Sequence, residues 1–196
     1  MIRSFLAIDL PEVLRPHLAL LQGELKRSHA DVRWVPVGNI HLTLKFFGNV
    51  PASEVDAITA AAREVAVRQE AFQLQATRAG AFPNTRSPRV IWVGIGGEVV
   101  PLAQLYHGLE KAFAALGYLP EGRAFNPHLT LGRVKSPTNR HRLAQLLEKL
   151  PPLDWPPFKV GELILFRSNL TPQGSIYTPL QVIPLGRDGE QKGIRG

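Results

Sequence analysis

The chain has 196 residues, with 23 lysines and arginines against 16 aspartates and glutamates, which give a formal net charge of +7. It contains no cysteine, which excludes disulfides, thiolate metal sites and a cysteine nucleophile, and its 44% hydrophobic content excludes a disordered chain. The sequence shows neither a run of 18 apolar residues nor the pattern of a secretory signal, so we expect a soluble cytoplasmic protein.

Runs of branched and aromatic residues, separated by glycine, proline, asparagine and serine, predict the strands. In chain order these strands cover residues 2–9, 32–35, 41–47, 72–77, 89–95, 158–167 and 175–183, and one more begins at His128. Longer segments between them predict helices over residues 11–28, 54–69, 99–116 and 138–150. Pro11 suits the first turn of its helix, Gly117 ends the third helix, and Ser53 with Asp56 resembles a weak capping box before the second.

Helices and strands interleave, yet hairpin-like neighbouring strands also occur. This order of elements favours an α+β fold with mostly antiparallel sheets over a doubly wound parallel sheet. No low-complexity linker divides the chain. We therefore expect a single domain over residues 1–185, followed by a frayed tail over residues 186–196 that is rich in glycine and charge.

One six-residue stretch occurs twice in the chain. Asn-Ile-His-Leu-Thr-Leu at residues 39–44 and Asn-Pro-His-Leu-Thr-Leu at residues 126–131 agree at five of six positions. Both copies follow a loop, begin a predicted strand and have a predicted helix beyond them. A duplicated unit, with a pseudo-twofold relation between its copies, is the most economical explanation.

Each copy places a histidine and a threonine on one face of its strand. Alternate side chains of a strand share a face, so His41 and Thr43 point one way and the neighbouring leucines point the other way. His128 and Thr130 repeat this arrangement. The leucines fix the register, because a slip of one residue would turn the histidine into the core. Two such units packed about a twofold axis would bring two imidazoles and two hydroxyls together across a cleft.

These four groups suit an in-line displacement at phosphorus. One neutral imidazole can take a proton from the attacking oxygen while one imidazolium gives a proton to the leaving oxygen. An ordinary histidine pKa of about 6.5 allows both forms near neutral pH. The threonine hydroxyls can donate hydrogen bonds to the non-bridging oxygens, where negative charge builds up. The reaction needs no metal and no other cofactor, and the residues alone do not decide which histidine is the acid.

Two other interpretations remain open. A single His-x-Thr-x stretch is most often only a strand with a polar face, and an ancient duplication could keep a structural histidine in each copy. A zinc site is a poorer explanation, because catalytic zinc needs about three protein ligands and neither copy has a third histidine or carboxylate at ligand spacing.

The paired motifs resemble the signature of the two-histidine phosphoesterase superfamily. More narrowly, residues 3–8 (RSFLAI), 41–48 (HLTLKFFG) and 125–133 (FNPHLTLGR) are similar to the bacterial and archaeal RNA 2′,3′-cyclic phosphodiesterases, which were first described as 2′-5′ RNA ligases. The resemblance extends from Arg3 to about Leu185.

The resemblance implies a bilobal α+β fold with two mostly antiparallel sheets around a central cleft and helices on the outside. It also implies hydrolysis of an RNA-terminal 2′,3′-cyclic phosphate to a 2′-phosphate, with His41 as proton donor to the departing 3′-oxygen and His128 as proton acceptor from water. Thr43 and Thr130 match the family's phosphate-binding threonines. Arg133 matches the arginine of a Gly-Arg pair that commonly follows the second motif.

Strict alternation argues against a phosphate-binding role for Arg133, because it places this side chain on the face of Leu129 and Leu131. A bend or bulge at Gly132 would return it to the phosphate side. In the first copy, Lys45 falls on the same face of the strand as His41 and Thr43. It is more typical, however, of a surface lysine at a strand end. Three aromatic residues near the motifs are expected in the core or cleft wall, where one could stack on a terminal base: Phe46, Phe47 and Phe125.

Three functional hypotheses follow. The leading one is metal-independent hydrolysis, with RNA that ends in a 2′,3′-cyclic phosphate, such as a fragment of transfer RNA, as the substrate. The second is reversible 2′-5′ joining of RNA strands, which would use the same residues. The third is an RNA-binding module that holds phosphate termini without turnover. We expect no membrane association, no obligatory protein partner and a monomer.

Overall fold

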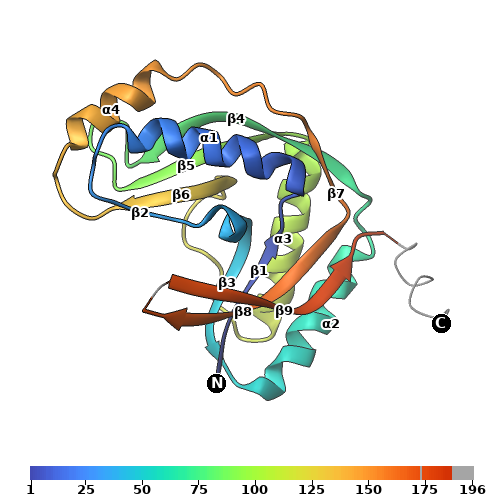
Figure 1. Cartoon of the computed structure of the whole chain (residues 1–196). Coiled ribbons are helices and arrows are strands. Elements are labelled where there is room, and N and C mark those ends of the chain that lie inside the picture. The colour runs from blue at the N-terminus through green and yellow to red at the C-terminus, as the bar shows by residue number, and fades with distance from the viewer. Residues whose placement is uncertain (173, 187–196) are drawn as a thin grey trace.

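In the computed structural model, residues 1–172 and 174–186 are described, and they form one curled antiparallel sheet of nine strands with helices packed against it (Figure 1). The strands are β1 (Ile2–Ile8), β2 (Val32–Trp34), β3 (Leu42–Val50), β4 (Phe72–Phe82), β5 (Val90–Gly97), β6 (His128–Val134), β7 (Phe158–Val160), β8 (Glu162–Thr171) and β9 (Gly174–Pro184). The helices are α1 (Arg15–Lys26), α2 (Val55–Ala66), α3 (Val99–Ala115) and α4 (Arg140–Lys149).

The order of the strands is symmetric about the two motif strands. Hydrogen-bonded neighbours run β7-β4-β5-β6-β3-β1-β8-β9, and β2 pairs with β6. The two central strands, β3 and β6, pair at Leu42 and Leu129, which occupy the same position in the two copies of the motif. A local twofold axis therefore passes between these leucines. The predicted α+β fold with antiparallel strands is confirmed, and the two expected sheets are two halves of one sheet that meet at this pair.

The helices pack in two pairs, and α3 of the second pair also contacts β4 in the first half of the sheet. α4 contacts α1 and β4, whereas α2 contacts α3, β8 and β9 (Figure 1). The leucines of both motif strands are buried and belong to one hydrophobic core, together with side chains such as Leu18 of α1 and Leu143 of α4. The leucine face of each motif strand is thus the core face, as predicted. None of the helices in the described part of the chain is long and apolar enough to cross a membrane.

The first motif strand contains a β-bulge directly after its threonine. In the register between β1 and β3, Ala7 lies opposite Thr43 and Leu6 lies opposite Lys45, so Leu44 is the extra residue. A bulge inserts one residue into one strand, and side chains beyond it therefore change face. Lys45 turns into the protein and is only 4% exposed. The expectation that Lys45 is a surface residue at a strand end is wrong.

The second motif strand has a bulge at the equivalent position. In the register between β5 and β6, Trp92 lies opposite Thr130 and Ile91 lies opposite Gly132, so Leu131 is the extra residue. Arg133 consequently returns to the face of Thr130. The bulge that the sequence required for Arg133 exists, one residue earlier than Gly132.

Gly132 allows β2 to approach β6 at this bulge. A Cβ atom on Gly132 would lie 2.7 Å from Cγ1 of Val32, 3.1 Å from Cε3 of Trp34 and 3.2 Å from the carbonyl oxygen of Arg33. Contacts this short would force the two strands apart, so close backbone packing requires a glycine here.

A buried glutamine from α1 holds the bulge in β6. The side-chain amide of Gln22 donates hydrogen bonds to the carbonyl oxygens of Val35, at 2.8 Å, and Leu131, at 3.0 Å. The backbone N–H of Val35 donates to the same Leu131 oxygen at 2.9 Å. Gln22 is thus the donor that connects α1 to the extra residue of the second motif.

The boundaries of some elements differ from those predicted. A 3₁₀ turn over Ala52–Glu54 precedes α2, and among the described residues no side chain caps this helix, so the capping box at Ser53 is wrong. The single strand expected over 158–167 divides at Gly161 into β7, which pairs with β4, and β8, which pairs with β1. β4 continues to Phe82 rather than ending at residue 77. Except for Gly186, the expected tail lies outside the described residues.

Replacement of Gln22 by leucine tests the support of the bulge. We expect Gln22→Leu to lower the free energy of unfolding by about 1–3 kcal/mol, because the Val35 carbonyl loses its Gln22 donor and the Leu131 carbonyl keeps only the Val35 N–H. Equilibrium unfolding in urea measures this difference. Gln104→Leu, on the exposed side of α3, is the matched control and should change stability by less than about 0.5 kcal/mol. Equal losses in the two variants would contradict the role given to Gln22.

Candidate active site

Both motif histidines are held in the same way by the backbone. Nδ1 of His41 lies 2.8 Å from the carbonyl oxygen of Asn39, and Nδ1 of His128 lies 2.7 Å from the carbonyl oxygen of Asn126. A carbonyl oxygen can only accept a hydrogen bond, so Nδ1 carries the proton in each ring. Nε2 is therefore the nitrogen that remains to exchange a proton with a ligand.

The two histidines and two threonines gather around the local twofold axis. Continuing the register set by Leu42 and Leu129 places His41 opposite Thr130, and Thr43 opposite His128. All four side chains lie on the face that the core leucines do not occupy. The structure thus brings together, from segments far apart in the sequence, the groups that the duplicated motif predicted to meet.

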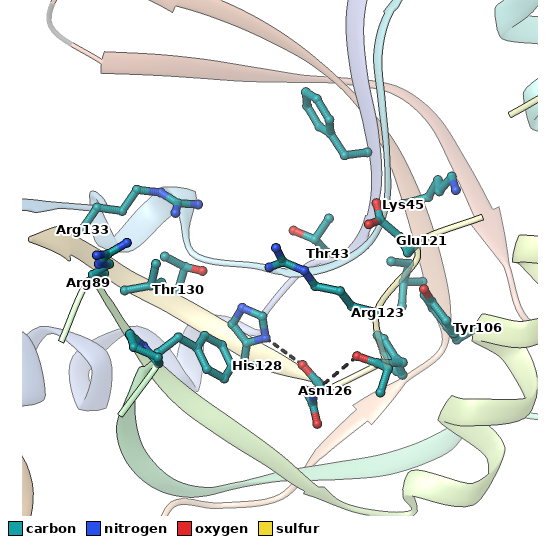
Figure 2. A pocket seen from close by; sticks show the side chains of 17 residues that line it. Thr43, Lys45, Arg89, Tyr106, Glu121, Arg123, Asn126, His128, Thr130 and Arg133 are labelled. Carbon is teal, nitrogen blue, oxygen red and sulfur yellow. Dashed lines mark hydrogen bonds between the residues drawn. The ribbon is translucent and has the colours of Figure 1, made fainter. Parts of the chain in front are cut away.

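Two adjoining cavities open on this face. The larger, of about 790 Å³, borders His128, and the smaller, of about 250 Å³, borders His41. Residues that line both cavities form their shared wall: Thr43, Phe46, Thr130 and Arg133. Figure 2 shows Thr43, Thr130 and Arg133 directed toward the space beside His128. An anion bound at the shared wall would lie between the two histidines, with two hydroxyls and one guanidinium beside it.

His41 lies in an aromatic surrounding. Its ring stacks on Phe5 with 4.6 Å between ring centres and meets the edge of Tyr177 at 5.4 Å. This burial lowers the pKa of His41 below the usual histidine value of 6.5, and it outweighs the hydrogen bond to the Asn39 carbonyl and the Asp9 carboxylate, which both act to raise it.

The segment before His41 is anchored by an arginine of α1. The Arg15 guanidinium donates to the carbonyl oxygens of Val37, at 2.7 Å, and Ile40, at 3.2 Å. It also forms an ion pair with Asp9 at 3.0 Å. These contacts fix the 3₁₀ turn Val37–Asn39 that supplies the carbonyl partner of His41.

His128 has a different surrounding from His41. Its ring meets the edge of Phe82 at 5.1 Å between ring centres and borders the larger cavity. The first motif therefore holds a histidine enclosed by aromatic rings, whereas the second holds a histidine beside open space. This difference breaks the local symmetry of the repeat.

The larger cavity also contains residues that the sequence did not single out. Arg89 directly precedes β5, and Arg123 lies in the loop that leads to β6 (Figure 2). Tyr106 of α3 lines the same cavity and stacks on Phe125 at 3.9 Å between ring centres. No local pattern marks Arg89 or Arg123. Arg89 becomes recognisable only once β5 is known to pair with β6, which places it near Arg133.

A buried ion pair holds the loop that carries Arg123. Nζ of Lys45 lies 2.8 Å from Glu110 of α3 and donates to the carbonyl oxygen of Leu119 at 2.6 Å. The second carboxylate oxygen of Glu110 accepts a hydrogen bond from the backbone N–H of Glu121 at 2.7 Å. Both members of the pair therefore bind the backbone of this loop.

The predicted aromatic residues occupy different places. Phe46 is 42% exposed on the shared wall, and the Arg3 guanidinium lies over its ring at 4.6 Å. Phe47 packs against Phe113, and Phe125 borders the larger cavity.

Within residues 1–172 and 174–186, no group of three or more histidine, aspartate or glutamate side chains is arranged to hold a metal ion.

A curled antiparallel sheet with two His-x-Thr-x strands at its centre defines a two-histidine phosphoesterase. The family described as LigT like Phosphoesterase matches residues 8–92 and 97–177. The chain belongs to this family.

The similar proteins cover nearly the whole chain. An RNA 2′,3′-cyclic phosphodiesterase of Methanothermobacter thermautotrophicus is 41% identical over 184 residues, which are 94% of this chain and 99% of that protein. The crystal structure of a Thermus thermophilus protein matches with a TM-score of 0.79 at 30% identity and covers 94% of this chain and 99% of its own. E. coli LigT complexed with 3′-AMP matches with a TM-score of 0.77 at 31% identity, over 94% of this chain and 98% of that one.

Titration of His41 tests whether burial lowers the pKa of its imidazole. We expect its titration midpoint, followed by NMR of the labelled imidazole, to lie below 6.5, because burial disfavours the charged ring. Tyr177→Ala opens one side of the ring to water and should raise the midpoint toward 6.5. Ile176→Ala, at an exposed neighbouring position, should leave it unchanged. A midpoint at or above 6.5 in the unaltered protein would show that burial does not control this group.

Proposed function

We propose that this protein hydrolyses the 2′,3′-cyclic phosphate at the end of an RNA to a 2′-phosphate, without a metal ion. The observation that carries the proposal is the pair of histidines, each held through Nδ1, on the two sides of a wall formed by Thr43, Thr130 and Arg133. The naming of relatives as RNA 2′,3′-cyclic phosphodiesterases supports the choice of substrate.

The proposed reaction is a single in-line displacement. The cyclic phosphate binds at the shared wall, and Nε2 of His128 takes a proton from a water molecule as the water oxygen attacks phosphorus. The bond between phosphorus and the 3′-oxygen breaks, and His41 gives its Nε2 proton to that oxygen. The product carries a 2′-phosphate and a 3′-hydroxyl. Thr43, Thr130 and Arg133 stabilise the charge on the non-bridging oxygens.

The different surroundings of the histidines support this assignment of roles. His128 borders the larger cavity, where water can reach it, and therefore suits the group that activates water. His41 is enclosed by Phe5 and Tyr177, so its proton is directed to the leaving oxygen rather than to solvent. Burial lowers its pKa in the free protein, but a negatively charged phosphate beside the ring raises that pKa again. His41 can thus hold its proton once the substrate is bound.

The proposed enzyme needs no partner chain. Both halves of the sheet, within residues 1–185, contribute one histidine and one threonine to the site. We therefore propose that residues 1–185 act as one catalytic domain in a monomer.

The first test of the function is the identity of the product. With EDTA present, the protein should convert a short RNA ending in a 2′,3′-cyclic phosphate to the 2′-phosphate, resolved from the 3′-phosphate by chromatography. His41→Ala and His128→Ala should each lower the rate by about 100-fold or more, because each removes one proton transfer. His141→Ala, on the exposed surface of α4, is the control.

Other outcomes of that assay would favour the other hypotheses. A 3′-phosphate product, or full activity in either variant, would overturn the proposed mechanism. Binding of the unchanged RNA without conversion would favour a module that only holds RNA ends. Formation of a longer, 2′-5′-linked RNA from two strands would favour joining over hydrolysis.

The threonines give a separate test of transition-state stabilisation. Thr43→Val and Thr130→Val keep the side-chain shape and remove the hydroxyl donor, so each should lower kcat by about 100-fold while changing KM little. Steady-state kinetics on the cyclic-phosphate RNA measure both constants. Thr178→Val, at an exposed position in β9, should leave them unchanged. A rise in KM alone would mean that the hydroxyls serve only ground-state binding.

A further inference from the structure

Three arginines contribute to the larger cavity from three different segments. Arg133 belongs to β6, Arg89 precedes β5, and Arg123 lies in the loop before β6 (Figure 2). In the part of the chain that the structure describes, none of the three forms an ion pair, and the Glu121 carboxylate at the same cavity pairs with none of them. Cations gathered in this way without partners indicate an anionic ligand.

The three arginines differ in their position relative to the proposed reaction centre. Arg133 lies on the wall shared by both cavities, beside the two threonines. Among the described residues, Arg89 and Arg123 border the larger cavity and not the smaller one. A cyclic phosphate carries one negative charge, which already faces Arg133 and a protonated histidine. Arg89 and Arg123 are therefore available for a second anionic group.

The backbone around both of these arginines is fixed. The N–H of Arg89 donates to the carbonyl oxygen of Phe82 at 2.8 Å, and its own carbonyl oxygen accepts from Val134 at 2.9 Å. The loop of Arg123 is held by the buried pair of Lys45 and Glu110. Burying two charges costs desolvation energy, so such a pair is weak as a source of stability. Here it positions the wall that carries Arg123.

The larger cavity also has the size and surface of a nucleotide site. Its volume of about 790 Å³ is far more than one attacking water molecule needs. Phe82 and Phe125 supply apolar wall next to the arginines, a combination that suits a strand with alternating phosphates and bases.

We propose that Arg89 and Arg123 bind a second, non-reacting phosphate of the RNA, namely the one on the 5′ side of the terminal nucleotide. This inference rests on the proposed hydrolysis of the cyclic phosphate at the shared wall. The preferred substrate is then an RNA strand of two or more nucleotides, and a nucleoside 2′,3′-cyclic phosphate without a 5′-phosphate is a poor one.

Three substrates that differ in one group each test the proposal. They are adenosine 2′,3′-cyclic phosphate, the same compound with a 5′-phosphate, and the dinucleotide ApA with a 2′,3′-cyclic phosphate end. The unaltered protein should show a kcat/KM at least about tenfold higher for the two substrates that carry a 5′-side phosphate. In the double variant Arg89→Gln, Arg123→Gln this preference should disappear, with a ratio of the kcat/KM values of about 1.

Two single variants separate this role from general effects. Arg133→Gln should lower kcat/KM by a similar factor for all three substrates, because Arg133 faces the reacting phosphate. Arg142→Gln, exposed on α4, removes one positive charge that lines neither cavity and should leave the preference unchanged. The double variant loses one contact to a single-strand phosphate. For the substrates with a 5′-side phosphate, the slope of log(kcat/KM) against log salt concentration should therefore become smaller in magnitude by about 0.7.

The outcomes distinguish this inference from the proposed function. Equal kcat/KM for the substrates with and without a 5′-phosphate, or a preference that survives in the double variant, would overturn the inference and leave the hydrolase intact. Failure to convert any of the three would instead overturn the proposed function. Binding of the same three compounds, measured by calorimetry, would then test the phosphate site. The two compounds with a 5′-side phosphate should bind more tightly than the one without it. The double variant should lose that difference.

Discussion

The extra residue directly after the threonine of each motif strand decides which side chains face the cleft. Leu44 and Leu131 are equivalent bulge positions, each directly after the motif threonine. Before the bulge, simple alternation places histidine and threonine on the cleft side and leucine in the core. Beyond it the faces are exchanged, so Arg133 reaches the cavity wall beside the threonines and Lys45 turns inward. The buried amide of Gln22 and the close approach of β2 at Gly132 hold the second bulge in place.

The duplication supplies a symmetric centre, and differences between the copies make it asymmetric. The twofold axis between Leu42 and Leu129 relates one imidazole and one hydroxyl in each half. At the two positions after the bulge, the first copy has Lys45 and Phe46, whereas the second has Gly132 and Arg133. The first pair supplies a buried charge that anchors a loop and an aromatic surface on the shared wall. The second pair supplies close packing and a cation. The two halves of the site therefore differ in the side chains that they contribute beyond the shared histidine and threonine.

The sequence predicts the parts of this site that depend on local pattern. The histidines and threonines precede the bulges, so period-two alternation alone places them correctly, and the matching copies indicate that they meet. Lys45 follows a bulge that no local pattern reveals, and its predicted exposure was therefore wrong. Arg89 and Arg123 enter the site through the pairing of β5 with β6 and through a loop held by Glu110, which are long-range contacts. The division of residues 158–167 between β7 and β8 is also a matter of strand pairing rather than of propensity.

Aromatic rings enclose one of the two motif histidines. Phe5 and Tyr177 remove water from His41, and burial lowers its pKa while the site is empty. A phosphate at the shared wall brings negative charge next to the ring and favours the imidazolium form. Under the proposed mechanism, the substrate thus helps to create the acid that its own cleavage requires. His128 borders the larger cavity instead, so under the proposed mechanism two identical motifs perform opposite proton transfers because their surroundings differ.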